Sequence, residues 1–357
     1  MQENVSLAPL TTLGVGGAAR FFSEAKSVDE VIAALGEAKR RDLGVAVLGG
    51  GSNTLVPDAG VDGLVLRIAI PGITFHERAE GTVAVTAGAG VVWDDLVRET
   101  VTRGLGGLES LSGVPGTVGG AVVSSIGAYG AQVSDTLESV EVIDRTNTAY
   151  ALRMLPVSAC ALSYHDSVFA REPAHYLITA ATFVLRSGAA AQPAYEDYRF
   201  RFPQPQDGHT LTLADVRAAV LDIREAKGTL IMEGRESYRC AGSFFHMPFV
   251  TKEMYEQVVR TARTLDAEKE ARLQPWAWAQ PDGSYKLAPG FLLEYTEFQK
   301  GYVRGGAGIS PKHTLSIINL GDAHAVDIAR LADDMQHAVE HIFGVRLERE
   351  VETLIAR

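Results

Sequence analysis

The chain has 357 residues, of which 46% are hydrophobic and 22% are charged, a composition typical of a folded globular protein. Its length favours two or three domains over one. The formal net charge of −11 argues against a protein that binds nucleic acid or anionic membranes through a general basic surface. A local cationic pocket for a phosphorylated substrate remains compatible with this charge.

The two cysteines, Cys160 and Cys240, are too few for a disulfide framework or a cysteine-rich metal site. This cysteine usage suits a reducing compartment, and we expect a cytoplasmic protein. The first residues show neither the basic nor the apolar segment of a signal peptide. No run approaches the roughly 18 apolar residues that a membrane-spanning helix needs, so we expect no membrane insertion.

The first half of the chain alternates short strands with a few helices and glycine-rich turns. A helix is predicted over residues 27–41 because Ser27 and Glu30 form a capping box ahead of an amphipathic pattern. A second helix is predicted over residues 93–103, ending at Gly104. The predicted strands cover residues 45–48, 63–68, 82–87, 140–144 and 177–185. This mixed order indicates an α+β fold rather than regular β-α-β units.

A polar, proline-rich stretch over residues 188–210 marks the predicted domain boundary. The helices predicted beyond it cover residues 212–227, 250–271 and 323–343. A final strand is predicted over residues 345–355, with Glu348, Glu350 and Glu352 on one face. Like charges on one strand face repel each other. Either this face is solvated, or one carboxylate bends into a site where its charge is useful.

Two glycine-rich loops carry the strongest functional signal. The first, residues 49–54, follows a predicted strand but leads into another strand, so it is not the dinucleotide-binding turn of a Rossmann fold. A phosphate there would be held by main-chain N–H groups, with the side chains of Ser52, Asn53 and Thr54 as further donors. The second loop covers residues 112–121 and 126–130. A tight hairpin explains either loop alone, but together they indicate a nucleotide cofactor held mainly by backbone amides.

Three further patterns each have a structural and a functional interpretation. His337 and His341 complete an H-x-x-E-H motif, but they lie opposite the apolar face of the predicted helix, and no metal site is expected. Lys227 falls within the apolar stripe of its helix, where it either extends past the helix end into water or points at an anion. Ser243 lies between small residues and two phenylalanines, which suits a buried core hydroxyl or one that faces a ligand.

Taken in order, these segments resemble the UDP-N-acetylenolpyruvoylglucosamine reductases, flavoenzymes of bacterial peptidoglycan precursor synthesis. The resemblance covers nearly the whole chain. Its most specific pair is Gly-Val-Pro-Gly at residues 113–116 and Ala-Gly-Ser-Phe-Phe at residues 241–245. The other matching segments are Thr12-Leu13-Gly14-Val15-Gly16-Gly17, Gly49-Gly50-Gly51-Ser52-Asn53, Ile126-Gly127-Ala128-Tyr129-Gly130, Tyr164-His165-Asp166-Ser167 and Leu347-Glu348-Arg349-Glu350-Val351.

The resemblance implies a two-part FAD-binding domain of the vanillyl-alcohol-oxidase type, over residues 1–70 and 71–190. An α+β substrate-binding domain would follow over residues 211–357, with its final strand returning to the active site. NADPH would reduce bound FAD and leave, and the enolpyruvyl ether of a UDP-sugar would then take a hydride. A monomer is favoured. The residues expected to bind the cofactor are Gly49, Gly50, Gly51, Ser52, Asn53, Thr54, Ser112, Gly113, Pro115, Gly116, Thr117, Gly119, Gly120, Ile126, Gly127 and Ala128.

The resemblance also implies roles for individual side chains. Ser243 is expected to protonate the enol intermediate, and Glu350 is expected to be the catalytic carboxylate of the terminal strand. Arg224 and Lys227 fall where the family binds the substrate diphosphate and carboxylate, which favours the anion-facing interpretation of Lys227. Tyr195 resembles the tyrosine of a mobile loop that covers the diphosphate.

Two positions depart from the family pattern. His165 stands where the family usually has an arginine that neutralises the substrate carboxylate, and it is included among the catalytic candidates. A histidine neutralises a carboxylate only when protonated, and its ordinary pKa is about 6.5. Either neighbours such as Glu350 keep it charged, or another arginine substitutes, with Arg171 the nearest in sequence. At His246-Met247 the family commonly has Lys-Asn. Because Met247 cannot donate a hydrogen bond to a phosphate, we expect an unusual substrate affinity or pH dependence.

Two other interpretations stay open. The first is another oxidoreductase of the same FAD fold, such as a hydroxy-acid or sugar oxidase, although these lack the Ala-Gly-Ser-Phe-Phe segment and the terminal Leu-x-x-Glu-Val strand together. The second is a flavin- or nucleotide-binding protein that has lost catalysis. Only His165 favours this second interpretation, and the presence of Ser243 and Glu350 argues against it.

Overall fold

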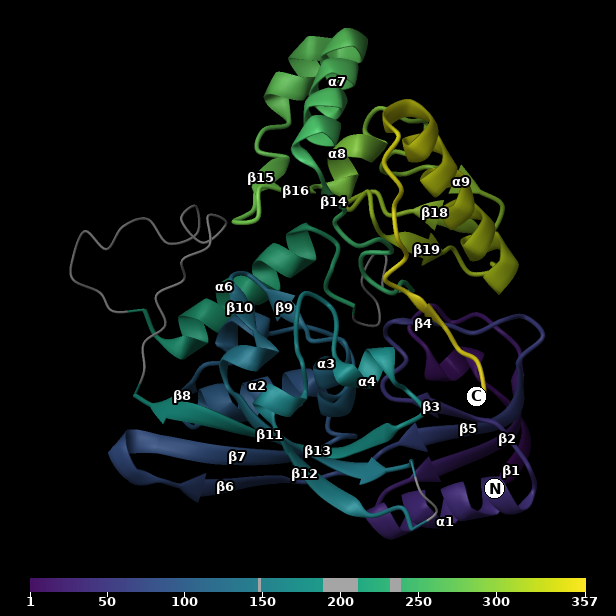
Figure 1. Cartoon of the computed structure of the whole chain (residues 1–357), viewed down its shortest axis with the longest axis vertical. Coiled ribbons are helices and arrows are strands. Elements are labelled where there is room, and N and C mark those ends of the chain that lie inside the picture. The colour runs from purple at the N-terminus through teal and green to yellow at the C-terminus, as the bar shows by residue number, and fades with distance from the viewer. Residues whose placement is uncertain (147–148, 189–210, 232–238) are drawn as a thin grey trace.

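The computed structural model describes residues 1–146, 149–188, 211–231 and 239–357. Figure 1 shows two β-sheets at the base of the molecule, a layer of helices above them, and an upper part made by the residues after 239. The predicted α+β fold is confirmed, since helices and mainly short strands are mixed along the chain. The predicted boundary at residues 188–210, and Tyr195 with it, lies almost entirely outside the described residues.

The first sheet is built from the N-terminal part of the chain. Its order is β1-β2-β5-β3, with β5 parallel to both neighbours. These strands are β1 (Gln2–Ser6), β2 (Ala18–Ala25), β3 (Val45–Leu48) and β5 (Val61–Ile68). Helix α1 (Val28–Arg40) begins after Ser27, whose hydroxyl accepts the Glu30 N–H at 3.2 Å. Only this half of the predicted capping box forms, because the Glu30 carboxylate accepts the Lys26 N–H at 2.6 Å and not the Ser27 N–H. The apolar face of α1 joins a core shared with the second sheet.

The second sheet is antiparallel, with the order β12-β11-β13-β7-β6, and β8 pairs with one end of β13. Its strands are β6 (Ile73–Glu77), β7 (Thr82–Gly88), β8 (Leu105–Gly106), β11 (Leu137–Asp144), β12 (Leu152–Pro156) and β13 (Tyr176–Ser187). The helices α2 (Trp93–Thr102), α3 (Val118–Val123) and α4 (Val168–Arg171) lie above it, beside the hairpin of β9 (Gly127–Ala128) and β10 (Ala131–Gln132) (Figure 1).

Trp93 fixes helix α2 on this second sheet. Its side chain is fully buried, its indole N–H donates to the Leu111 carbonyl at 3.0 Å, and its ring packs edge-on against Phe183 of β13. An indole buried with its N–H satisfied stabilises a core without leaving an unpaired donor. Short 3₁₀ helices connect the larger elements at Ala8–Leu10, Ala79–Gly81, Glu109–Leu111, Val133–Asp135 and Val157–Ala159.

Helix α6 (Leu213–Ala226) comes shortly after the undescribed residues 189–210 and packs onto α2. Thr212 and Asp215 form a capping box at its start. Both guanidinium Nη atoms of Arg217 donate to the Asp94 carboxylate at 2.7 Å. Asp94 also accepts the Gly113 N–H at 2.6 Å, so this one carboxylate joins α2, α6 and the second glycine loop.

The upper part surrounds a second large core. Its helices are α7 (Lys252–Arg272), α8 (Pro289–Leu293) and α9 (Ala325–Phe343), and its strands are β14 (Phe249–Val250), β15 (Ala277–Ala279), β16 (Tyr285–Leu287), β17 (Val303–Arg304), β18 (Ala307–Ile309) and β19 (Ile317–Asn319). Leu13, Val15 and Leu55 from the N-terminal part complete this core. Within the described ranges, no helix is both long enough and apolar enough to cross a membrane.

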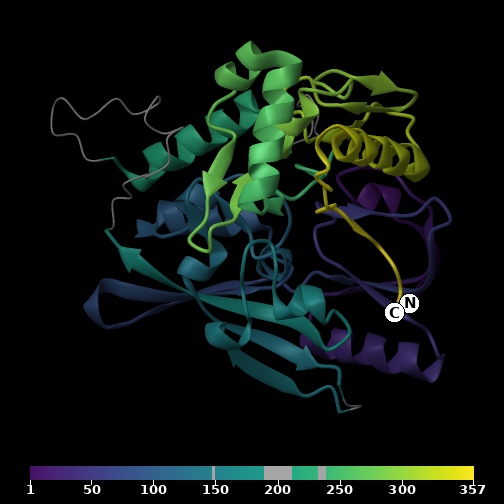
Figure 2. The same ribbon diagram turned by 45° about the horizontal axis from the view of Figure 1, so that its top comes forward.

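The C-terminal segment descends from α9 to the first sheet, and both termini lie on the same side of the molecule (Figures 1 and 2). The prediction of one strand over residues 345–355 is wrong in its extent. Only β20 (Glu352–Thr353) is a strand, parallel to β4 (Thr54–Leu55), and Arg349 forms an isolated bridge with Phe245. The segment takes different partners along its length, so no continuous ladder forms.

Candidate active site

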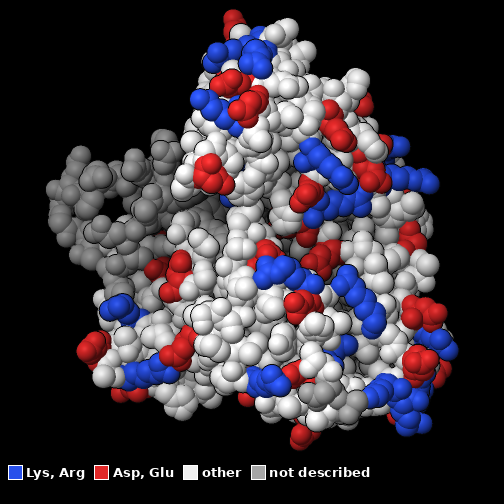
Figure 3. Space-filling model, in the orientation of Figure 1, with Lys and Arg blue, Asp and Glu red and all other residues white. Residues whose placement is uncertain are grey.

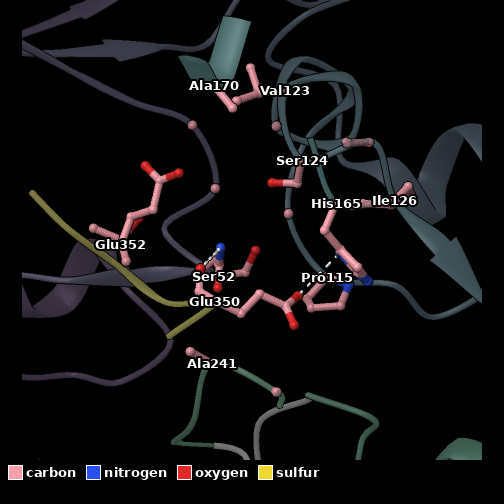
Figure 4. Close-up of a pocket in the computed structure, with 18 of the residues that line it drawn as sticks. Ser52, Pro115, Val123, Ser124, Ile126, His165, Ala170, Ala241, Glu350 and Glu352 are labelled. Carbon is pink, nitrogen blue, oxygen red and sulfur yellow. Dashed lines mark hydrogen bonds and ion pairs between the residues drawn. The ribbon is translucent and has the colours of Figure 1, made fainter. Parts of the chain in front are cut away.

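A cleft of about 1160 Å³ lies where the two sheets and the upper part meet. Both glycine loops, the α3 and α4 regions and the segments around Ser243, His313 and Glu350 line it. Figure 4 shows its centre, where the C-terminal segment passes between the first glycine loop and residues near Ala241. A deep site lined by mainly apolar surface with a few converging polar groups is the usual form of a cofactor pocket.

The structure brings most of the predicted cofactor residues into this one cleft. The residues that line it are Gly49, Gly50, Gly51, Ser52, Asn53, Thr54, Pro115, Gly116, Thr117, Gly119, Gly120, Ile126, Gly127 and Ala128. Ser112 and Gly113 do not line it. The Ser112 hydroxyl is buried and donates to the Glu109 carbonyl at 2.6 Å, and the Gly113 N–H is bound to Asp94. These two residues hold the second loop in its conformation from outside the cleft.

The two glycine loops meet main chain to main chain. A Cβ atom added at Gly50 would lie 2.7 Å from the Gly116 Cα, closer than any real side chain tolerates. Gly116 itself has φ +106°, a conformation that favours glycine. Glycine is therefore required at position 50 by the close approach of the loops and at position 116 by the backbone conformation.

Unpaired donors along these loops provide a test of whether the cleft fits FAD. Among the described residues, no acceptor bonds the main-chain N–H groups of Gly50, Gly51, Ser52 and Asn53. The Thr117 hydroxyl is buried and has no hydrogen-bond partner within the same ranges. Because buried polar groups are rarely left unsatisfied, the Thr117 hydroxyl needs a partner. The N–H groups belong to residues that line the cleft, where a bound anion or a flavin ring can accept from them. The residues present fit FAD.

The Asn53 side chain, in contrast, has an acceptor within the protein. Its Nδ2 atom donates to the main-chain carbonyl of Glu350 at 2.9 Å. The sequence predicted this amide as a donor to a phosphate, whereas the structure directs it to the C-terminal segment.

The carboxylate of Glu350 lies in the cleft between two imidazoles. Its Oε1 is 3.4 Å from His165 Nδ1, and its Oε2 is 3.8 Å from His246 Nδ1. Figure 4 shows the side chain pointing from the C-terminal segment toward the His165 ring. Burial raises the pKa of Glu350 to about 7. Of residues 348, 350 and 352, both Glu350 and Glu352 line the cleft, and Glu350 is the one whose carboxyl lies beside the two imidazoles.

His165 is neutral near pH 7 in this arrangement. Burial, His246 and Lys286 together lower its pKa to about 4. The expectation that Glu350 keeps His165 charged is therefore wrong. Arg171 does not replace the missing cation either, because it does not line the cleft and its guanidinium bonds to Asp166.

Ser243 lies beside Glu350 because two short segments cross. Gly242, with φ +76°, turns the chain ahead of Ser243. The Phe244 N–H then donates to the Leu315 carbonyl at 2.8 Å, and the Phe244 carbonyl accepts the Glu350 N–H at 2.9 Å. Ser243 and Glu350 both line the cleft. The structure thus brings together the two catalytic candidates, which are about a hundred residues apart in sequence.

One end of the cleft is cationic. Arg224 is buried at the end of α6, and its Nε atom has no hydrogen-bond partner in the described part of the chain. Lys227 follows as the C-terminal cap of α6 and lines the cleft, which agrees with the anion-facing interpretation. Lys300 and Lys312 also line it, and neither was identified from the sequence. They come from loops without a periodic pattern, so only the fold places them there.

His313 confirms that this end is strongly positive. Burial together with Lys300, Lys227 and Arg224 lowers its pKa to about 4. On the face drawn in Figure 3, Lys and Arg are interspersed with Asp and Glu. A cationic end inside an acidic protein indicates an anionic ligand such as a diphosphate.

Comparison with known proteins first gives the class. The family model for an FAD binding domain matches residues 19–152, and the model for the C-terminal domain of UDP-N-acetylenolpyruvoylglucosamine reductase matches residues 235–354. The fold and the cleft thus define a flavoprotein of the vanillyl-alcohol-oxidase type with a second domain that supplies Ser243 and Glu350.

Relatives then give the family. UDP-N-acetylenolpyruvoylglucosamine reductase of Thermobifida fusca is 36% identical over 98% of this chain and 96% of its own length, and that of Pseudomonas syringae is 36% identical over 98% of both. The crystal structure of the Thermus caldophilus reductase aligns with a TM-score of 0.65 and 25% identity, covering 99% of this chain and 98% of the other. The chain belongs to the UDP-N-acetylenolpyruvoylglucosamine reductase family.

Proposed function

We propose that this FAD-dependent oxidoreductase uses NADPH to reduce the enolpyruvyl ether of UDP-N-acetylglucosamine to UDP-N-acetylmuramate, in peptidoglycan precursor synthesis. The observation that carries the proposal is the convergence of Ser243 and Glu350 on the cleft that also holds both glycine loops and the cationic end. A hydroxy-acid or sugar oxidase of the same FAD fold has no need for this combination. The names of the relatives support the same reaction.

The glycine loops supply the cofactor site. Residues 49–54 and 116–128 would hold FAD through main-chain N–H groups and the Thr117 hydroxyl. FAD held there would supply hydride transfer from NADPH to the enolpyruvyl group. The close contact of Gly50 with Gly116 sets how near the two loops lie to each other.

Ser243 is proposed as the proton donor to the carbon next to the one that receives the hydride. A hydroxyl is a weak acid, so it protonates only a strongly basic carbanionic centre placed directly against it. Phe244, the next residue, bonds to Leu315 through its N–H and to Glu350 through its carbonyl. These two main-chain bonds hold Ser243 in place. Such fixed placement is the main contribution that a weak acid can receive from the protein.

Glu350 and His165 are proposed to bind the reacting carboxylate as neutral groups. With a pKa raised to about 7, Glu350 is substantially protonated near neutral pH and can donate a hydrogen bond where an ionised carboxylate would repel the substrate. His165, neutral because its pKa is lowered to about 4, can donate through one ring nitrogen. This pair offers hydrogen bonds where the family usually offers an arginine charge.

The cationic end is proposed to bind the substrate diphosphate. Arg224, Lys227, Lys300 and Lys312 all line it, and a diphosphate carries the opposite charge. With its UDP group bound at this end, the substrate would extend along the cleft and place its enolpyruvyl group at Ser243. We further propose that the protein acts in the cytoplasm as a monomer, in keeping with its two free, buried cysteines.

An anaerobic visible spectrum tests the whole proposal. NADPH should bleach the flavin bands, and the enolpyruvyl UDP-sugar should restore them stoichiometrically. Bands that bleach with NADPH but return only with oxygen would identify an oxidase of the same fold. A purified protein with flavin bands that NADPH leaves unchanged would contradict the reductase activity.

A further inference from the structure

Asn53 joins the cofactor loop to the segment that carries Glu350. Its side-chain Nδ2 donates to the Glu350 carbonyl at 2.9 Å, and its own main-chain carbonyl accepts the Glu352 N–H at 3.2 Å. The two bonds hold the chain on both sides of Val351, which is buried. Figure 4 shows Ser52, the neighbour of Asn53, beside Glu350 and Glu352.

Beyond Glu352 the same segment is bound to the first sheet. Its strand β20 pairs with β4, and the Leu354 N–H donates to the Leu55 carbonyl at 3.0 Å. Val45 of β3 donates its N–H to the Arg357 carbonyl at 2.9 Å. Thr353, Leu354, Ile355 and Arg357 line the cleft. The C-terminal segment is therefore a wall of the cofactor site as well as the support of Glu350.

On the other side of Glu350 the contacts belong to the upper part. The Glu350 N–H donates to the Phe244 carbonyl at 2.9 Å, and the His246 N–H donates to the Glu348 carbonyl at 2.9 Å. Glu350 thus lies where the chain passes from one part of the molecule to the other. Among the described residues, Asn53 is the residue of the N-terminal part whose side chain bonds the main chain of Glu350.

We propose that Asn53 is a positioning residue that sets the place of the Glu350 carboxyl and couples it to occupancy of the cofactor loop. This inference rests on the proposed function. The loop's N–H groups from Gly50 to Asn53 have no acceptor within the described residues, so bound FAD restrains the loop through them. A restrained loop holds the Asn53 amide against the Glu350 carbonyl. The carboxyl is then fixed between His165 and His246.

Two readouts test this coupling, with Asn53→Ala compared against Ser52→Ala in the same loop. The first is amide hydrogen exchange over residues 350–357, measured with and without FAD. We expect FAD to slow exchange at least tenfold in the parent and in Ser52→Ala, each at saturating FAD, but by less than threefold in Asn53→Ala. The expected difference follows because, of the two residues altered, Asn53 is the one whose side chain bonds this segment in the described part of the chain.

The second readout is the pH dependence of the two half-reactions. In Asn53→Ala, at saturating FAD, we expect re-oxidation by the enolpyruvyl UDP-sugar to slow at least tenfold more than reduction by NADPH does, and the pH midpoint of re-oxidation to shift. Ser52→Ala should lose FAD affinity and keep the parent's midpoint. Within the described ranges, the titratable groups near the Glu350 carboxyl are His165, His246 and Tyr164, and neither variant alters them.

Equal exchange behaviour in Asn53→Ala and Ser52→Ala would overturn the inference, as would a loss of FAD affinity with no change in exchange or midpoint. Should Asn53→Ala fail to fold, Asn53→Ser keeps a polar side chain too short to reach the Glu350 carbonyl and should give the same results. If the parent is not re-oxidised by the UDP-sugar, the proposed function fails. The exchange comparison still decides the role of Asn53 in that case.

Discussion

The carboxylate of Asp94 accepts two hydrogen bonds from Arg217, both at 2.7 Å, and a third from the Gly113 N–H at 2.6 Å. Burial alone would raise the pKa of Asp94, but Arg217 and the Gly113 N–H hold it below its ordinary value. An isosteric Asp94→Asn substitution leaves Arg217 with only one good acceptor. We expect it to lower the free energy of unfolding by about 2 kcal/mol at pH 7, measured by urea denaturation.

The matched control for Asp94→Asn is Asp62→Asn, because Asp62 pairs with Arg20 at the surface. Exposed ion pairs contribute little, so Asp62→Asn should change stability by less than about 0.5 kcal/mol. Since the pKa of Asp94 is lowered, its contribution is complete above the ordinary carboxyl pKa and is lost as pH falls through the lowered value. The free energies of unfolding of Asp94→Asn and Asp62→Asn should therefore become equal in strong acid. Equal stability at pH 7 would contradict the role given to Asp94.

Gly50→Ala tests the contact between the glycine loops. Its Cβ would lie 2.7 Å from the Gly116 Cα, so the loops must separate. We expect a loss of FAD affinity of at least tenfold, measured by recovery of flavin fluorescence on dilution. Gly36→Ala is the control, because Gly36 is in α1 with no atom within 4 Å of an added Cβ. That change should stabilise the protein by about 0.5–1 kcal/mol and leave FAD affinity unchanged.

Glu350→Gln should change how stability depends on pH. The pKa of Glu350 is raised to about 7 in the folded protein, so between its ordinary value of 4.5 and 7 the folded state holds a proton that the unfolded state has lost. The free energy of unfolding therefore falls as pH rises through this window. Glu350→Gln removes that decline, so its Tm should exceed the parent's by more at pH 8 than at pH 5. Glu340→Gln, on the exposed side of α9, should follow the parent at both pH values.

Ser243→Ala separates the two halves of the proposed reaction. NADPH should still bleach the flavin at a rate close to the parent's, because no proton from Ser243 is needed in that half. Re-oxidation by the enolpyruvyl UDP-sugar should slow by about 10²–10⁴-fold, the usual contribution of a positioned proton donor. Stopped-flow absorbance measures both rates on one sample. Equal losses in both halves would remove Ser243 from the role of proton donor.

Lys312→Ala tests the cationic end of the cleft, which the sequence did not reveal. Loss of one charge-assisted contact to the diphosphate should raise KM for the UDP-sugar about tenfold with little change in kcat. The flavin content should stay at the parent level, since Lys312 lies away from the glycine loops in the proposed arrangement. Lys252→Ala, at the exposed start of α7, is the control and should leave KM unchanged.

Much of the fold follows from local sequence signals. The Ser27 cap, the stop at Gly104 and the helix start predicted at Thr212 each placed a helix end within one or two residues, because a cap is determined by neighbours in the chain. The strand predicted over residues 345–355 failed for the opposite reason. Its partners are Phe245, Asn53, Leu55 and Val45, all distant in sequence, and alternation alone cannot show that the pairing is broken.

The candidate site divides in the same way. The glycine loops and Ser243 were identifiable because their patterns are local, whereas Lys300 and Lys312 reach the cleft only through the tertiary fold. The charge of His165 was also beyond the sequence. Its neutrality comes from burial beside His246 and Lys286, which come from other segments. The Asn53 amide was assigned to a phosphate because its actual acceptor, the Glu350 carbonyl, lies 297 residues later.

Asp58 shows how the ends of the chain depend on each other. Its carboxylate oxygens accept the N–H groups of Ala325 at 2.8 Å and Val326 at 3.0 Å, and so cap the first turn of α9 from the N-terminal part. Leu13, Val15 and Leu55 fill the core beneath that helix. During synthesis on the ribosome, these N-terminal groups emerge long before α9. A fragment that begins at residue 239 would keep the local capping box of His324 and Asp327 but would lack the Asp58 carboxylate and one side of its core.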